Sequence, residues 1–272
     1  MMRTFVSKTG LYAVLIFFAL LIGSPFLLGL SISLIPQEEI VAGHYFSVHI
    51  SLNHYLEAFQ NTTFVHYLMN SVLVSLAVTA GQLLLSSLAA YAFVFPKFKG
   101  QNLLFYLFIS TMMVPFEAQM IPNFETIRDL GWLNTYPALI LPFIASAFGT
   151  FLLRQHFKQI PMELKEASDL MGISHWKFYL KVVLPMSKIS LVTLGTYSFL
   201  TTWNQYLWPI LVTTNDTART VQIGLKQMQS QETLNDWGMI MACAVTVAIP
   251  TLLVLFAGQK HLQKGLTEGS IK

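Results

Sequence analysis

Residues 11–34 of the chain read LYAVLIFFALLIGSPFLLGLSISL, and no charged side chain interrupts the run. A helix of about 20 apolar residues crosses the hydrocarbon core of a bilayer, so this stretch is long enough to span a membrane. It exceeds the apolar core of a signal peptide, which has about 7–15 residues, and no small-x-small cleavage site follows it. We therefore predict that it is a retained first span.

The composition of the whole chain agrees with a membrane protein. Of 272 residues, 54% are hydrophobic and 11% are charged, against roughly 25% charged residues in soluble domains. A soluble chain of this size could not bury so much apolar surface, and a disordered chain would need the opposite composition. The single cysteine, Cys243, excludes a disulfide framework, and a net charge of +3 does not suggest a nucleic-acid partner.

Five further apolar runs complete the predicted architecture, an all-α integral membrane protein. We expect one transmembrane domain over residues 1–272, with six spans at about 11–34, 68–94, 103–121, 136–153, 189–212 and 239–258. Proline interrupts five of these spans. Such prolines are either irregularities tolerated by neighbouring helices or marks of a moving bundle that lines a cavity. They are Pro25, Pro115, Pro142, Pro209 and Pro250.

The basic residues predict the direction of the spans. With the N-terminus inside, 13 of the 16 Lys and Arg residues lie in the cytoplasm, and only Arg128, Arg219 and Lys226 lie outside. An excess of Lys and Arg marks cytoplasmic loops. We therefore expect both termini in the cytoplasm.

A polar loop at about residues 158–186 separates the fourth and fifth predicted spans. We predict two short helices in it, because Pro161 suits a first helical turn, Gly172 suits a helix end and Ser174 suits a helix start. Pro185 is expected to end the second helix. The first helix carries an apolar stripe formed by Leu164, Ala167, Leu170 and Met171.

This exposed apolar stripe needs a covering surface, and two alternatives are open from the residues alone. The helix pair lies on lipid headgroups, assisted by Lys165, Lys177 and Lys181. Otherwise it is a rigid knob that docks into a cytoplasmic partner.

The loop resembles the EAA loop of ABC-importer permeases. Glu166-Ala167-Ser168 stands in the position of the E-A-A triplet, and Gly172 follows in the family register. Two positions depart: Ser168 replaces an alanine, and Met171 stands where sugar permeases commonly carry an aspartate that would add one polar contact to the ATPase. The resemblance implies that an ATPase docks on Glu166, Ala167, Ser168, Gly172, Val182, Leu184 and Pro185.

Three other segments resemble carbohydrate-type permeases of the maltose and glycerol-3-phosphate group: residues 145–157, 201–212 and 258–272. This resemblance implies a bacterial or archaeal plasma membrane protein with three kinds of partner. These are a second homologous permease subunit, a cytoplasmic ABC ATPase dimer and an extracytoplasmic substrate-binding protein. The chain contains no G-x-x-x-x-G-K-[ST] phosphate loop, so we expect it to be no enzyme and to bind no cofactor, with ATP and Mg²⁺ on the ATPase.

Polar and aromatic residues in the spans are candidates for a substrate pathway. Trp203, Asn204, Gln205 and Tyr206 form a dense set in the fifth span, and their amide and aromatic groups suit sugars and polyols. The alternative for the amides is hydrogen bonding between packed helices. Glu117 and Gln119, near the outer end of the third span, are further candidates, although Glu117 could equally lie at the outer surface.

The last outer loop, Thr213–Trp237, is polar. By resemblance to maltose-type relatives it contacts the binding protein through Asn215, Asp216, Gln227 and Gln229, and the alternative is a solvated connector. In the first outer loop, His44, His49 and His54 recur every five residues. We predict that these histidines are solvated and bind no metal.

We therefore predict a permease subunit of an ATP-driven ABC importer. It would form half of the pathway for a carbohydrate or for a polyol phosphate such as sn-glycerol 3-phosphate. No Lys or Arg lies inside a predicted span, which weakens the phosphate interpretation. The alternatives are a self-contained secondary transporter or channel and, with no legible catalytic constellation, a membrane enzyme.

Overall fold

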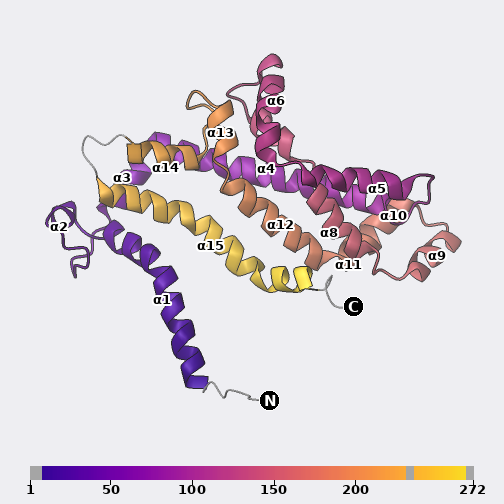
Figure 1. Ribbon diagram of the computed structural model, residues 1–272, viewed down its shortest axis with the longest axis horizontal. Helices are drawn as coiled ribbons and strands as arrows, with labels where there is room; N and C mark the ends of the chain where they lie inside the picture. Colours follow the sequence, from indigo (N-terminus) through magenta and orange to yellow (C-terminus); the bar gives the residue numbers. More distant parts are fainter. Residues whose placement is uncertain (1–7, 231–235, 268–272) are drawn as a thin grey trace. The chain divides into compact units, whose positions relative to one another are not determined.

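The computed structural model describes residues 8–230 and 236–267, and over that part of the chain it is helical and contains no strand (Figure 1). The prediction of an all-α protein is confirmed. The chain forms two compact units, which we describe separately. The first unit comprises residues 1–65 and 225–249, and the second comprises residues 66–224 and 250–272.

The first unit contains the N-terminal span and a short helical segment behind it. Helix α1 (Lys8–Ser33) matches the first predicted span, with Pro25 inside it. Helices α2 (Gln37–Val41) and α3 (Asn53–Gln60) follow, and neither was predicted. Ile32, Ile35 and Ile40 pack together against Met241 of α15 (Trp237–Thr267).

The histidines of this unit are placed differently from one another. His44 and His49 are exposed, as predicted, and His49 Nδ1 lies 2.7 Å from Glu39 Oε1. Hydrogen bonds from Ser47 and His49 lower the pKa of Glu39. For His54 the prediction of a solvated side chain was wrong, because this residue is only 4% exposed. Sequence spacing could not reveal the helix α15 that covers it.

The second unit is built along the long helix α4 (Thr62–Ala92). The remaining helices are shorter, and several consecutive pairs are separated by breaks of a few residues. They are α5 (Gln101–Ser110), the 3₁₀ turn η1 (Thr111–Met113), α6 (Phe116–Asp129), α7 (Tyr136–Ile140), the 3₁₀ turn η2 (Leu141–Phe143), α8 (Ala147–Phe157), α9 (Met162–Leu170), α10 (His175–Phe178), the π-helix η3 (Tyr179–Val183), α11 (Leu184–Met186), α12 (Lys188–Trp203) and α13 (Leu207–Val212). Helix α14 (Val221–Ser230) begins in this unit, and its residues from 225 onward belong to the first unit.

Within the described residues, three helices are long and apolar enough to cross a membrane by themselves: Gly10–Ser33, Thr62–Ala92 and Trp237–Gln259. The count rises to six if each bent helix pair is one span. Residues 101–113 and 116–129 form the first pair, bent by 96°. Residues 136–143 and 147–157 form the second, bent by 42°. Residues 175–186 and 188–203 form the third, bent by 78°.

The third, fourth and fifth predicted spans are therefore not continuous helices. Figure 1 shows α6 turning away from the line of α5. Pro115 stands at the start of α6 with φ −57° and ψ 141°, because a proline has no N–H to continue the preceding helix. In the fifth span α12 ends at Trp203 and α13 begins at Leu207.

Two apolar clusters form the core of the second unit. One, which we call the inner cluster, includes Ala90, Leu153, Phe157, Phe178 and Leu194. The other, the outer cluster, includes Val78, Ile127, Leu139, Trp208 and Val212. The candidate site residues are distributed between these two clusters.

Candidate functional site

The segment from α9 to α11 folds as a helix pair with a glycine turn. Gly172 has φ +65°, a left-handed conformation that glycine adopts at low cost. Its N–H donates to the Asp169 carbonyl (3.0 Å), and Ile173 N–H donates to the Ser168 carbonyl (2.9 Å). Ser174 Oγ accepts from Lys177 N–H (3.3 Å) at the start of α10. The predicted helix end and helix start are confirmed, whereas the helical run continues past Pro185 to Met186.

Several large apolar side chains of this helix pair are exposed. Leu170 is 90% exposed, Met171 70% and Trp176 58%. We call these three side chains, together with the less exposed Leu164, the exposed apolar face. Glu166 and Gly172 are also exposed beside it. Side chains of this size rarely stay exposed together unless another surface covers them.

The opposite side of α9 faces the protein. Lys165 is buried, pairs with Asp169 one turn along, and lies 5.8 Å from the centre of the Phe178 ring. Ser168 is buried too, and Ala167 is half-buried. Lys165 is therefore turned away from any lipid surface. This observation removes one of the three lysines on which the headgroup alternative depends.

Hydrogen bonds fix the helix pair to α4. Tyr179 OH lies 2.7 Å from Ser87 Oγ, and both atoms are buried. Tyr91 OH lies 3.1 Å from His175 Nδ1. Val182 and Leu184, two of the predicted docking residues, pack against the inner cluster rather than on the surface. The segment is thus joined to the bundle by polar and apolar contacts.

The fifth-span candidates lie at the break between α12 and α13. Trp203 is buried and stacks on Phe199, with ring centres 5.7 Å apart. Asn204 is exposed, and its Nδ2 donates to the Leu200 carbonyl (2.8 Å) of its own helix. Gln205 and Tyr206 are half-buried in the break. Irregular backbone at membrane depth is tolerated where it faces protein or a watery cavity.

The third-span candidates lie at a second break. Glu117 and Gln119 are exposed in the first turn of α6, directly after the break at Val114 and Pro115. Gln119 Nε2 donates back across the break to the Val114 carbonyl (3.1 Å). Both sets of candidates thus stand where a helix is interrupted, which the sequence did not predict.

Three aromatic rings connect the breaks. Phe116, Phe143 and Trp208 have ring centres 5.3 to 6.1 Å apart, and we call them the aromatic triad. Phe116 opens α6, Phe143 ends η2, and Trp208 lies in the first turn of α13. Trp208 is fully buried, and its Nε1 donates to the Ala138 carbonyl (2.9 Å). It is a packing residue here rather than an interfacial belt residue.

Helix α4 satisfies the backbone freed by the break in the fourth span. Gln82 Nε2 donates to the Phe143 carbonyl (2.8 Å), and Ser86 Oγ donates to the Ser146 carbonyl (3.3 Å). Gly81 allows this approach, because a Cβ there would lie 2.7 Å from Ile144 Cγ2. Unpaired backbone in a membrane costs several kcal/mol, on the order of 4, so these donors stabilise the break.

The loop that we predicted at residues 213–237 is ordered by polar contacts up to α14. Asn134 has φ +63°, and its Oδ1 accepts from the N–H groups of Thr214 (2.6 Å) and Asn215 (3.0 Å). Asp216 Oδ1 accepts from Tyr67 OH (2.5 Å) and Arg219 Nη1 (2.8 Å). Asn215 and Asp216 remain exposed.

Helix α14 was not predicted within this loop. Gln227 is half-buried and Gln229 is exposed on it. The described part of the loop thus contains a helix and the ordered contacts of Asn134, while its contact with a binding protein stays a prediction. Its later residues, 231–235, lie outside the described residues.

No pattern in the sequence identifies Ser87, Tyr91 and His175, which join the helix pair to α4. Their partners lie 84 and 92 residues away along the chain. Local spacing on a single helix does not identify such long-range pairs.

A family model described as binding-protein-dependent transport system inner membrane component matches residues 82–268, which include the helix pair and all three breaks. The chain belongs to this family. It is therefore an inner membrane component of a transport system of the binding-protein-dependent type. The alternatives of a self-contained secondary transporter or channel and of a membrane enzyme are not favoured.

Relatives within the family are similar over most of the chain. The sn-glycerol-3-phosphate transport system permease protein UgpE of Yersinia pestis bv. Antiqua (strain Antiqua) is 38% identical over 209 residues, covering 76% of this chain and 74% of the relative. The UgpE protein of Brucella abortus (strain 2308) is 34% identical over 238 residues, covering 87% and 83%.

A solved structure has the same fold. It is a chain of a bacterial ABC transporter involved in the import of the acidic polysaccharide alginate. The TM-score is 0.86 at 24% identity, over 96% of this chain and 98% of the other. The two chains thus share one fold over nearly their whole length.

Proposed function

We propose that this permease is one half of the translocation pathway of an ATP-driven importer for sn-glycerol 3-phosphate. The proposal rests on one observation, the identity of 34–38% to UgpE proteins over 74% or more of this chain, within one family. Other carbohydrates and polyol phosphates are the competing substrates.

Binding of the phosphate group would require cationic hydrogen-bond donors, of which this chain offers few. Arg154 lies inside α8, directly after the end of the fourth predicted span. Its guanidinium, however, lies 3.6 Å from the centre of the Phe105 ring, and its Nε donates to the Phe93 carbonyl (3.4 Å). Arg154 is therefore used in packing, and cationic phosphate ligands would come from the second permease subunit or the binding protein.

Uptake by the assembled transporter tests this substrate. Proteoliposomes that contain the permease pair and the ATPase, with the binding protein outside and ATP inside, should accumulate labelled sn-glycerol 3-phosphate and little labelled maltose. Accumulation of maltose without glycerol phosphate would overturn the substrate and leave the permease function standing.

We place the ATPase contact on the exposed apolar face. A cytoplasmic ATPase would bury Leu170, Met171 and Trp176, whose exposure in the isolated chain is otherwise unfavourable. Glu166 and Gly172 border the same face, and Val182 and Leu184 anchor it to the inner cluster. The bonds of Tyr179 to Ser87 and of Tyr91 to His175 would then transmit movement of the ATPase to α4.

Replacing Leu170 by Asp tests the docking. The buried carboxylate should reduce co-purification of the ATPase at least tenfold, because an unpaired charge in a contact is costly. Leu130→Asp is the matched control, since Leu130 is also exposed at a helix end but lies after α6, on the side we assign to the exterior. Equal loss in both variants, or no loss in Leu170→Asp, would contradict this docking site.

The pathway residues of this proposal are those at the breaks. Asn204, Gln205 and Tyr206 interrupt the fifth span next to the buried Trp203. Glu117 and Gln119 stand at the break before α6. Exposed amide and carboxylate groups at interrupted helices offer hydrogen bonds to the hydroxyl groups of a polyol.

The binding protein would contact the extracytoplasmic loop through Asn215, Asp216, Gln227 and Gln229. Asn134 and Tyr67 hold the first two in place from their own elements. Pre-ordered polar side chains lose less entropy on binding than those of a flexible loop.

A further inference from the structure

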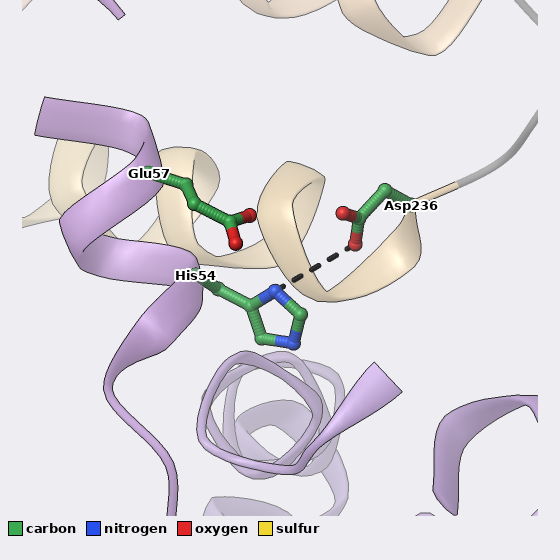
Figure 2. A group of neighbouring side chains, drawn as sticks. All are labelled: His54, Glu57 and Asp236. Atoms are coloured by element: carbon green, nitrogen blue, oxygen red, sulfur yellow. Dashed lines mark ion pairs between the residues drawn. The ribbon is translucent and has the colours of Figure 1, made fainter. Parts of the chain in front are cut away.

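A cluster of three metal-ligating side chains lies in the first unit, away from the pathway and the docking segment. His54 and Glu57 come from α3, one turn apart, and Asp236 directly precedes α15. Figure 2 shows all three side chains directed toward one another. One ligand atom from each lies within 4.8 Å of the other two.

The imidazole of His54 is held with one nitrogen facing the two carboxylates. Its Nε2 lies 3.0 Å from the Ile35 carbonyl, which can only accept, so Nε2 carries the proton. Nδ1 then presents a lone pair, 3.7 Å from Asp236 Oδ1. Among the described residues this buried Nδ1 has no hydrogen-bond partner, although the side chain is only 6% exposed.

The backbone around the imidazole is shaped for it. A Cβ on Gly238 would collide with the His54 ring, so only glycine in the first turn of α15 permits this position. Asp236 is also fixed, because its Oδ1 accepts from Met239 N–H (3.0 Å). Backbone carbonyls that orient a histidine through its second nitrogen are typical of metal centres.

We propose that His54, Glu57 and Asp236 bind a divalent transition-metal ion of the zinc class. A neutral imidazole and two carboxylates carry a charge of −2, which a divalent ion neutralises. One nitrogen and two oxygen ligands suit tetrahedral Zn²⁺ with a fourth, open position, whereas Ca²⁺ and Mg²⁺ prefer oxygen alone. Ligand atoms around tetrahedral zinc lie about 3.4 Å apart, so these ligand atoms must approach one another by up to about 1.4 Å.

The bound ion would join α3 to the start of α15. The described contacts between these two places include the 3.7 Å approach of His54 Nδ1 to Asp236 Oδ1 and the packing of the His54 ring on Gly238. A metal cross-link would therefore fix the helical segment that follows the first span. This role is independent of the transported substrate.

Zinc binding by the purified full-chain transporter tests the proposal. Competition with a chromophoric chelator should give one more zinc per copy of this chain in the wild type than in His54→Gln. His49→Gln is the matched control, because His49 is exposed and pairs with Glu39 in the same segment. That control should keep the wild-type stoichiometry.

A second variant guards against misfolding of His54→Gln. Glu57 is exposed, and Glu57→Gln keeps its size, so assembly of the transporter should be unchanged while zinc affinity falls at least tenfold. Co²⁺ should give a tetrahedral absorption band in the wild type that both variants lose, and excess Ca²⁺ should not displace it. Equal zinc binding by the wild type and both variants would overturn the proposal, as would the absence of a cobalt band in the wild type.

Discussion

Gly81 shows at the scale of one residue how tightly the fourth span is packed against α4. A Cβ at this position would lie 2.7 and 2.9 Å from Ile144 Cγ2 and Cβ. Ile144 lies just after η2, where the backbone cannot move freely because Gln82 holds the adjacent Phe143 carbonyl. The close approach of the broken fourth span thus leaves room only for glycine at position 81.

The variant Gly81→Ala should therefore destabilise the purified transporter, by about 1–3 kcal/mol as for other overpacked sites. Gly195→Ala is the matched control, since a Cβ there would meet Leu83 Cδ1 at 3.6 Å, an ordinary contact. In that helix interior alanine should be neutral or stabilising, by about 0.5–1 kcal/mol. Midpoints of thermal unfolding in detergent measure both. A higher midpoint for Gly81→Ala would show that the backbone at Ile144 yields easily.

At the scale of elements, the interrupted helices concentrate the polar groups of the second unit. Asn204 and Gln205 occupy the break between α12 and α13, and the Asn204 amide bonds only within its own helix among the contacts described. An amide that does not link two helices is free to meet a substrate. This geometry favours a pathway role over interhelical bonding for Asn204.

Asn204→Ala and Gln205→Ala should each lower the rate of substrate uptake several-fold while the ATPase still co-purifies. The lost hydrogen bonds, about 0.5–1.5 kcal/mol each, correspond to about two- to tenfold changes in affinity. Ser110→Ala serves as a control, because its exposed hydroxyl donates to the Leu107 carbonyl of α5. Loss of assembly together with uptake would identify the two residues as packing residues instead.

Some elements could be predicted from the sequence and others could not, for physical reasons. The long helices α1, α4 and α15 follow from hydropathy alone, and the turn at Gly172 follows from local chemistry. Hydropathy averaged over a window cannot detect a break such as the one at residues 204–206, because apolar residues flank it on both sides. Short amphipathic helices such as α2, α3 and α14 are decided by tertiary packing rather than by their own sequence.

The role of the candidate site residues stays a prediction, whereas their surroundings were not predicted. Asn204, Gln205 and Glu117 were selected as polar residues in apolar surroundings, and the structure places them at breaks that the sequence did not reveal. The aromatic triad was not foreseen, because Phe116, Phe143 and Trp208 come from three separate segments. Burial of His54 likewise depends on Gly238, which lies far along the chain.

At the scale of the whole molecule, the distribution of Lys and Arg gives the chain a direction in the membrane, which we propose as termini inside. Cys243 is the only cysteine and is buried, so Cys243→Ser provides a background for single reporters. In intact spheroplasts a membrane-impermeant maleimide should label Asn215→Cys and spare Glu163→Cys, both of which are exposed positions. Labelling of Glu163→Cys alone would invert the topology.

The aromatic triad has a mechanical consequence. Three interrupted spans that share one buried indole cannot bend one at a time, because moving any of them opens a void beside Trp208. We therefore expect the three spans to move together around the Trp208 side chain. We also expect few stable intermediates between the end states of the transporter. The fluorescence of Trp208, in a variant whose other four tryptophans are replaced, would report the passage between them.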